Sequence, residues 1–178
     1  MRLVTMFTLA ALLVAVLSFS GAGTLLASAP PALTQLHFLL GKWEAIPQDK
    51  PGEPSGSFVF APSLQDRIIL RTNYAEYPAT ENKPASTHTD LMIIYLDDAS
   101  RVRADYYDSE GHVIRYAVQP AGSDSVVFLS DAAPSAPRFR LTYSVAADST
   151  LKGQFEIAQP GKPGAFGPYL SWAARRVK

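Results

Sequence analysis

Residues 88–119 read HTDLMIIYLDDASRVRADYYDSEGHVIRYAVQ. This stretch contains three runs rich in Ile, Val, Leu and Tyr, at 88–96, 101–107 and 112–119, with polar turns centred near Asp98 and Glu110. Short runs of this composition, bounded by turn residues, indicate β-strands. Because each connection is short, the neighbouring strands must be antiparallel, since a parallel pair needs a crossover of about a dozen or more residues.

The same spacing continues on both sides of this stretch. Further turns are centred near Gly122, Pro134, Asp148 and Lys162, at intervals of about twelve to fourteen residues. Segments 48–56 and 78–86 contain proline and read as loops. Further strands are expected at 42–45, 57–60, 67–75, 125–130, 138–145, 151–158 and 169–176.

The resulting fold is all-β. A meander of about eight to ten strands has to close on itself or split into two sheets to hide its edges. We predict an antiparallel up-and-down β-barrel with one short N-terminal helix. The helix is expected at 32–40, where Leu33, Leu36, Leu39 and Leu40 form an apolar stripe that ends at Gly41.

Residues 1–29 are expected to be a signal peptide or an N-terminal anchor. Arg2 precedes an apolar run of 17 residues, 3–19, and small residues follow it. Cleavage is expected after Ala29 or, because Pro30 disfavours that position, near Ala22. A run of this length also lies at the lower limit for crossing a bilayer, so an uncleaved inner-membrane anchor is the alternative. The domain at 30–178 is therefore predicted to be exported, either periplasmic or secreted.

Composition excludes several functional classes. The chain has 178 residues with 16 basic and 16 acidic side chains, so neither nucleic acid nor an anionic membrane surface is an expected partner. The chain has no cysteine, and therefore neither a disulfide nor a lipid-modified cysteine. The 149 residues after position 29 are enough to bury a core without such crosslinks.

No catalytic or metal motif stands out. The chain has no G-x-S-x-G nucleophile elbow and no phosphate-binding glycine loop. Its three histidines, His37, His88 and His112, are 51 and 24 residues apart, unlike zinc ligands. Asp108 and Glu110 lie at an expected turn, where acidic residues are common. We predict no catalytic residue, no metal site and no cofactor.

Polar side chains inside a barrel are the candidate ligand-binding groups. If Tyr74 shares the face of Ile68 and Leu70, its hydroxyl points into the lumen, and Tyr116 does the same beside Ile114. The candidate lumen residues are Tyr74, His88, Tyr107, His112, Tyr116 and Arg140.

Each candidate also has an ordinary structural explanation. Tyrosines pack in cores, and histidines at strand starts are commonly solvated or capped. By the alternation of their strands, four arginines are expected on the outer wall of the barrel, where an exposed cation is usual. They are Arg71, Arg103, Arg115 and Arg140.

The sequence LHFLLGKWE at 36–44 resembles the opening of lipocalin-like proteins of the calycin group. The resemblance implies that Trp43, in Gly-Lys-Trp, plugs one end of the barrel. YLDD at 95–98, YYDSEGH at 106–112 and SWAARR at 171–176 are similar to a bacterial lipocalin-like domain of unknown function. The similarity runs from about residue 33 to the end of the chain, and extends distantly to nitrobindin-like and fatty-acid-binding-like barrels. Nitrobindin-like barrels bind haem through a histidine near the last strands, but no histidine follows His112, so haem is not expected.

The leading functional hypothesis is an exported, non-enzymatic lipocalin-like barrel that binds a small apolar or amphipathic molecule in its lumen. One alternative is a filled barrel that serves as a structural or protein-interaction module of the cell envelope, with loops 48–56 and 78–86 as its contact surface. Another is a lumen-based acid–base enzyme, which requires His88 or His112 in the cavity beside a tyrosine or arginine. The presence or absence of a cavity distinguishes among these hypotheses.

Overall fold

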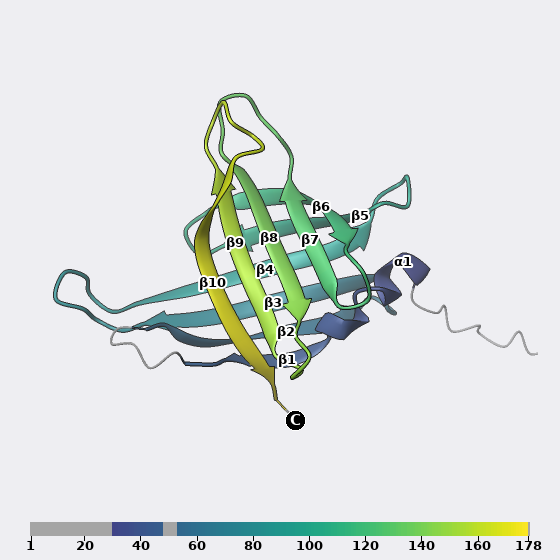
Figure 1. Ribbon diagram of the computed structural model, residues 1–178. Helices are drawn as coiled ribbons and strands as arrows, with labels where there is room; N and C mark the ends of the chain where they lie inside the picture. The colour runs from purple at the N-terminus through teal and green to yellow at the C-terminus, as the bar shows by residue number, and fades with distance from the viewer. Residues whose placement is uncertain (1–29, 48–52, 178) are drawn as a thin grey trace, which may run out of the picture.

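The computed structural model describes residues 30–47 and 53–177, and these residues form a closed ten-strand barrel (Figure 1). Each strand pairs antiparallel with its neighbours in sequence, and β1 also pairs with β10, which closes the sheet. The strands are β1 (Gly41–Ala45), β2 (Ser55–Ser63), β3 (Ile68–Tyr77), β4 (Ser86–Leu96), β5 (Val102–Asp108), β6 (Val113–Pro120), β7 (Ser125–Ser130), β8 (Arg138–Val145), β9 (Leu151–Ala158) and β10 (Phe166–Arg176). The predicted fold class is confirmed.

Several strands extend beyond their expected bounds, and β2 and β10 do so by the most residues. β10 begins at Phe166 rather than at 169, and β2 begins at Ser55, inside the expected loop. β2 continues because it pairs with β3 as far as Ser55 opposite Glu76. Gly56 permits this pairing, since a Cβ there would lie only 2.3 Å from the Tyr74 carbonyl oxygen. The predicted signal or anchor segment, 1–29, lies outside the described residues.

The N-terminal segment lies across one end of the barrel (Figure 1). In place of one helix at 32–40, it contains helix α1 (Pro31–Thr34) and the 3₁₀ turn η1 (His37–Leu39). The Trp43 side chain is 1% exposed, and its Nε1 donates to the Leu39 carbonyl at 2.7 Å. The Arg176 guanidinium stacks over the Trp43 ring at 4.3 Å and donates to the carbonyls of Leu40 and Phe38. These contacts join the first and last strands to the end segment.

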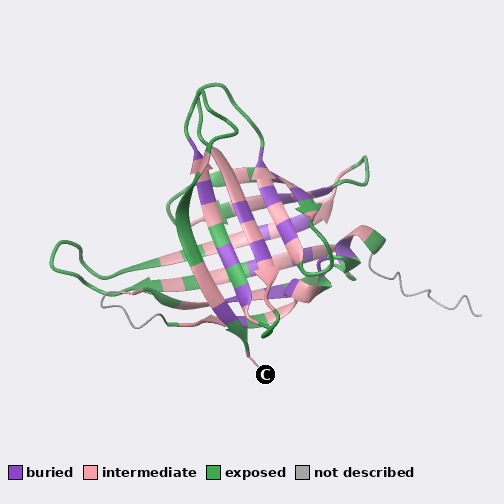
Figure 2. Ribbon diagram, viewed as in Figure 1, coloured by how far each residue is buried: buried purple, intermediate pink, exposed green. Residues whose placement is uncertain are grey.

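The strands alternate between an inner and an outer face (Figure 2). On the inner face, Tyr143 packs edge-to-face against Phe60, Phe128 and Trp172, with ring centroids 5.5–6.1 Å apart. In the part of the chain that the structure describes, no helix is long and apolar enough to cross a membrane.

Candidate functional site

Figure 1 shows α1 at one end of the barrel and the hairpin between β3 and β4 at the other. Residues next to this hairpin, among them Tyr77 and Ser86, line a cavity of about 1120 Å³. One side of it is apolar, and we call this side the apolar wall. It consists of Phe58, Phe139, Leu141, Phe155, Ile157 and Trp172. Gly153 makes room for this arrangement, because a Cβ at that position would lie 2.1 Å from the Trp172 ring. Packed side chains thus fill the Trp43 end of the barrel, whereas the other end contains the cavity.

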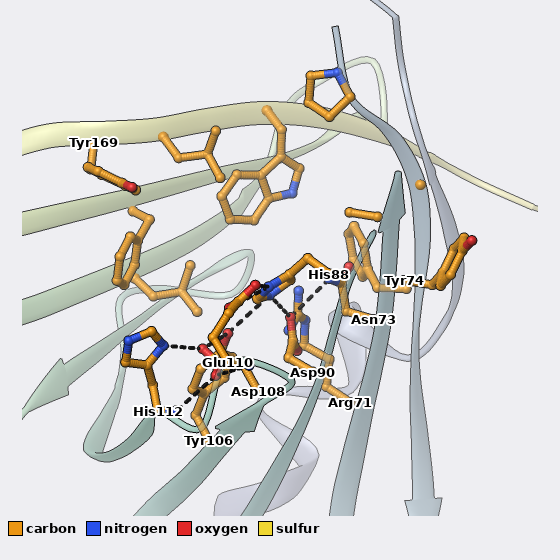
Figure 3. A pocket seen from close by; sticks show the side chains of 18 of the residues that line it. Arg71, Asn73, Tyr74, His88, Asp90, Tyr106, Asp108, Glu110, His112 and Tyr169 are labelled. Carbon is orange, nitrogen blue, oxygen red and sulfur yellow. Dashed lines mark hydrogen bonds and ion pairs between the residues drawn. The ribbon is translucent and has the colours of Figure 1, made fainter. Parts of the chain in front are cut away.

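The opposite side of the cavity is polar (Figure 3). It comes from β3, β4, β5 and the short hairpin loop at 109–112. We call it the polar wall, consisting of Arg71, Asn73, His88, Asp90, Tyr106, Asp108 and Glu110. One cavity therefore offers both an apolar and a hydrogen-bonding surface, as small-molecule sites commonly do.

A buried ion pair lies at the base of the polar wall. The Arg71 and Asp90 side chains are 7% and 4% exposed, and Arg71 Nη1 donates to Asp90 Oδ1. Asn73 Nδ2 donates to the other carboxylate oxygen at 2.9 Å. The Arg71 guanidinium also lies over the Phe58 ring, 5.4 Å from its centroid. Because both charged groups are buried away from solvent, each is stabilised mainly by the opposite charge of the other.

His88 connects this ion pair to the hairpin loop. Its Nε2 lies 3.2 Å from Asp90 Oδ2 and 3.3 Å from the Tyr106 hydroxyl, and its Nδ1 lies 2.9 Å from a Glu110 oxygen. Partial burial lowers the pKa of His88, but Glu110 and Asp90 outweigh it, so the net effect is a pKa above the usual value. His88 is therefore held in a negative electrostatic environment.

Asp108 fixes the shape of the hairpin loop. Its Oδ1 accepts from the backbone N–H groups of Glu110 and His112, at 3.0 and 2.8 Å, and its Oδ2 lies 2.8 Å from His112 Nδ1. Burial raises the pKa of Asp108, but these hydrogen bonds and the nearby imidazole hold it below its ordinary value. Ligand atoms of Asp108, Glu110 and His112 lie within 4.8 Å of one another. The hairpin hydrogen bonds and the pairing of the Glu110 carboxylate with His88 already account for these positions, so we assign no metal to them.

Three tyrosines surround the buried guanidinium. Burial raises the pKa of Tyr143 to about 12, against the opposing effect of the Arg71 charge. Burial likewise raises the pKa of Tyr106 and of Tyr116. All three hydroxyls therefore remain protonated at neutral pH and supply no negative charge.

The sequence-derived candidates separate into two groups. His88, His112 and Tyr116 line the cavity. Tyr107 and Arg140 do not, because their neighbours Tyr106 and Leu141 take the inner face. Arg140 instead binds Glu156 on the outer wall, with its Nε 2.6 Å from the carboxylate.

Tyr74 and Arg71 lie on the opposite faces of β3 from those expected. Tyr74 borders the cavity, but its side chain points away from the polar wall and its hydroxyl donates to Glu76 at 2.5 Å (Figure 3). Arg71, expected on the outer wall, is inside and 6% exposed. The reason is that both faces of 68–75 carry apolar and polar residues, so alternation alone does not define which face is buried.

Most of the polar wall was missed by reasoning from the sequence. The useful signal was the pairing of polar residues across neighbouring strands, since Asn73 lies opposite Asp90, which in turn lies opposite Asp108. Tyr77 and Tyr169 at the cavity mouth were also missed. Tyr169 lies at a register shift between Pro168 and Leu170, a β-bulge that no residue pattern announces.

No protein-family model matches the chain, and no curated protein matches it significantly. The closed ten-strand antiparallel barrel is consistent with a calycin-like architecture.

Proposed function

We propose that this protein binds one small amphipathic molecule in the lumen of its barrel, without chemical conversion. The observation that carries the proposal is the cavity of about 1120 Å³ between the apolar and polar walls. This volume suits a lipid-sized or multi-ring ligand. The apolar part of the ligand would lie against Phe139, Phe155 and Trp172, and its polar part would lie against the polar wall.

The proposal includes the lipocalin-like relationship and an exported location. The relationship is supported by Gly41-Lys42-Trp43 entering the first strand and by Arg176 of the last strand stacking on Trp43. Export is supported by the apolar sequence after Arg2.

The experiment is a binding assay with a lumen-filling variant. N-phenyl-1-naphthylamine, a neutral apolar dye that fluoresces in apolar sites, is titrated into wild-type protein and into Ile157→Trp. Ile157 lines the cavity, so the larger indole should displace the dye and weaken binding at least about tenfold.

Ile93→Trp is the matched control. Ile93 lies between the fully buried Met92 and Ile94 and so faces outward from the barrel. Native mass spectrometry and solvent extraction of the purified protein then identify any molecule that it carries. Equal dye affinity in both tryptophan variants would overturn the proposal.

A lumen-based acid–base enzyme is the second candidate. The observation that favours it is His88 beside the Tyr106 hydroxyl in the cavity. The two functions differ in the fate of the ligand. A binding protein returns the extracted ligand unchanged after prolonged incubation, whereas an enzyme converts it and loses the conversion in His88→Gln.

A further inference from the structure

Acidic side chains outnumber basic ones in the lining of the cavity. Its described lining residues include four carboxylates, one guanidinium and the imidazoles of His88 and His112, and they include no lysine. The guanidinium is that of Arg71, which is already bound to Asp90. The carboxylates belong to Glu53, Asp90, Asp108 and Glu110.

The acidic character is accessible at the mouth of the cavity. The Glu110 side chain is 51% exposed and reaches the cavity from the hairpin loop, where its partner is His88 (Figure 3). The Arg71 side chain, by contrast, is 7% exposed at the base of the polar wall. A ligand that enters the lumen therefore meets the Glu110 carboxylate before it meets the Arg71 guanidinium.

Two tyrosines, Tyr77 and Tyr169, line the same cavity as Glu110. Tyr77, at the end of β3, lines the cavity, and burial together with the charge of Glu110 raises the pKa of its hydroxyl. Tyr169 packs edge-to-face on Phe155 of the apolar wall at 6.1 Å. Aromatic faces next to a carboxylate are the environment that stabilises an organic ammonium group.

We propose that the ligand is an amphipathic amine. Its ammonium group lies between Glu110, Tyr77 and Tyr169, and its apolar body lies against the apolar wall. A fatty acid is disfavoured at the mouth of the cavity, because its carboxylate would approach that of Glu110. The inference rests on the proposed function and names the chemical class of its ligand.

The test compares three ligands with the same ten-carbon chain: decylamine, 1-decanol and decanoic acid. Each competes with N-phenyl-1-naphthylamine at pH 7, in the presence of a chelator so that no metal ion occupies the carboxylates. The expected order of affinity is amine, then alcohol, then acid. Amine binding alone should weaken as ionic strength rises.

Glu110→Gln is the decisive variant. It should reduce decylamine affinity about tenfold, leave decanol unchanged and improve decanoic acid. Glu44→Gln is the matched control, because Glu44 pairs with Arg175 on the outer face and does not line the cavity.

Two different failures remain distinguishable. Binding of the acid as tight as that of the amine, or an equal effect of Glu110→Gln on all three ligands, would overturn the amine assignment while leaving lumen binding intact. If none of the three ligands displaces the dye from the wild-type protein, or if each displaces it equally well from Ile157→Trp, both proposals are wrong.

Discussion

Replacing Arg71 with methionine should be strongly destabilising. Arg71→Met retains much of the apolar length of the side chain but removes the charge that compensates Asp90, whose side chain is 4% exposed. Asp90 keeps Asn73 and His88 as hydrogen-bonding neighbours, yet neither replaces a permanent cation. Removing one partner of a buried ion pair costs about 3–5 kcal/mol.

This loss can be expressed as a change in melting temperature. A domain of about 150 residues has an unfolding entropy of roughly 0.3 kcal/mol per kelvin, so the expected decrease in Tm is roughly 10–16 °C. Differential scanning calorimetry at pH 7 measures it, and urea denaturation followed by circular dichroism gives the change in unfolding free energy independently.

Two further variants separate charge from packing. Arg71→Met combined with Asp90→Asn removes both charges and should recover most of the lost stability. Arg103→Met removes an arginine that pairs with the exposed Asp131 at 3.2 Å, and should cost less than about 1 kcal/mol. A loss below about 1 kcal/mol for Arg71→Met, or a double variant as unstable as the single one, would refute the reasoning.

Three other predictions concern separate parts of the barrel. Gly56→Ala should cost about 1–3 kcal/mol in urea denaturation, because its Cβ would lie 2.3 Å from the Tyr74 carbonyl oxygen and the backbone itself must move; an unchanged midpoint contradicts this. Trp43→Phe should cost about 1–3 kcal/mol, because it leaves the Leu39 carbonyl without its indole donor; calorimetry measures this, and an unchanged Tm would show that the bond contributes nothing. The raised pKa of His88 in the folded state means that its pairing with Glu110 stabilises the protein fully below the unfolded-state pKa of about 6.5 and is lost as pH rises through the folded-state pKa. Unfolding free energies of wild type and His88→Gln, measured from pH 5.5 to 8.5, should converge at the alkaline end, and a constant difference would contradict the assignment.

The sequence by itself determined the architecture. Turn residues near Asp98, Glu110 and Gly122 leave connections too short for parallel crossovers, and this requirement is local. In 114–118, Ile114, Tyr116 and Val118 share one apolar face of the strand. This assigns Tyr116 to the interior, where it is 1% exposed. These features depend only on residues close together in the chain.

The tertiary structure alone decided which groups meet in the lumen. Segments 68–75 and 91–96 carry apolar residues on both faces, so the burial of Arg71 and the opposite placement of Tyr74 follow from barrel closure rather than from pattern. The polar wall assembles from β3, β4, β5 and the hairpin loop, and Tyr169 reaches the mouth from a bulge in β10, distant in sequence. The physical reason is that local preference decides where the chain turns, whereas the compensation of a buried charge depends on register between strands, which only the closed barrel sets.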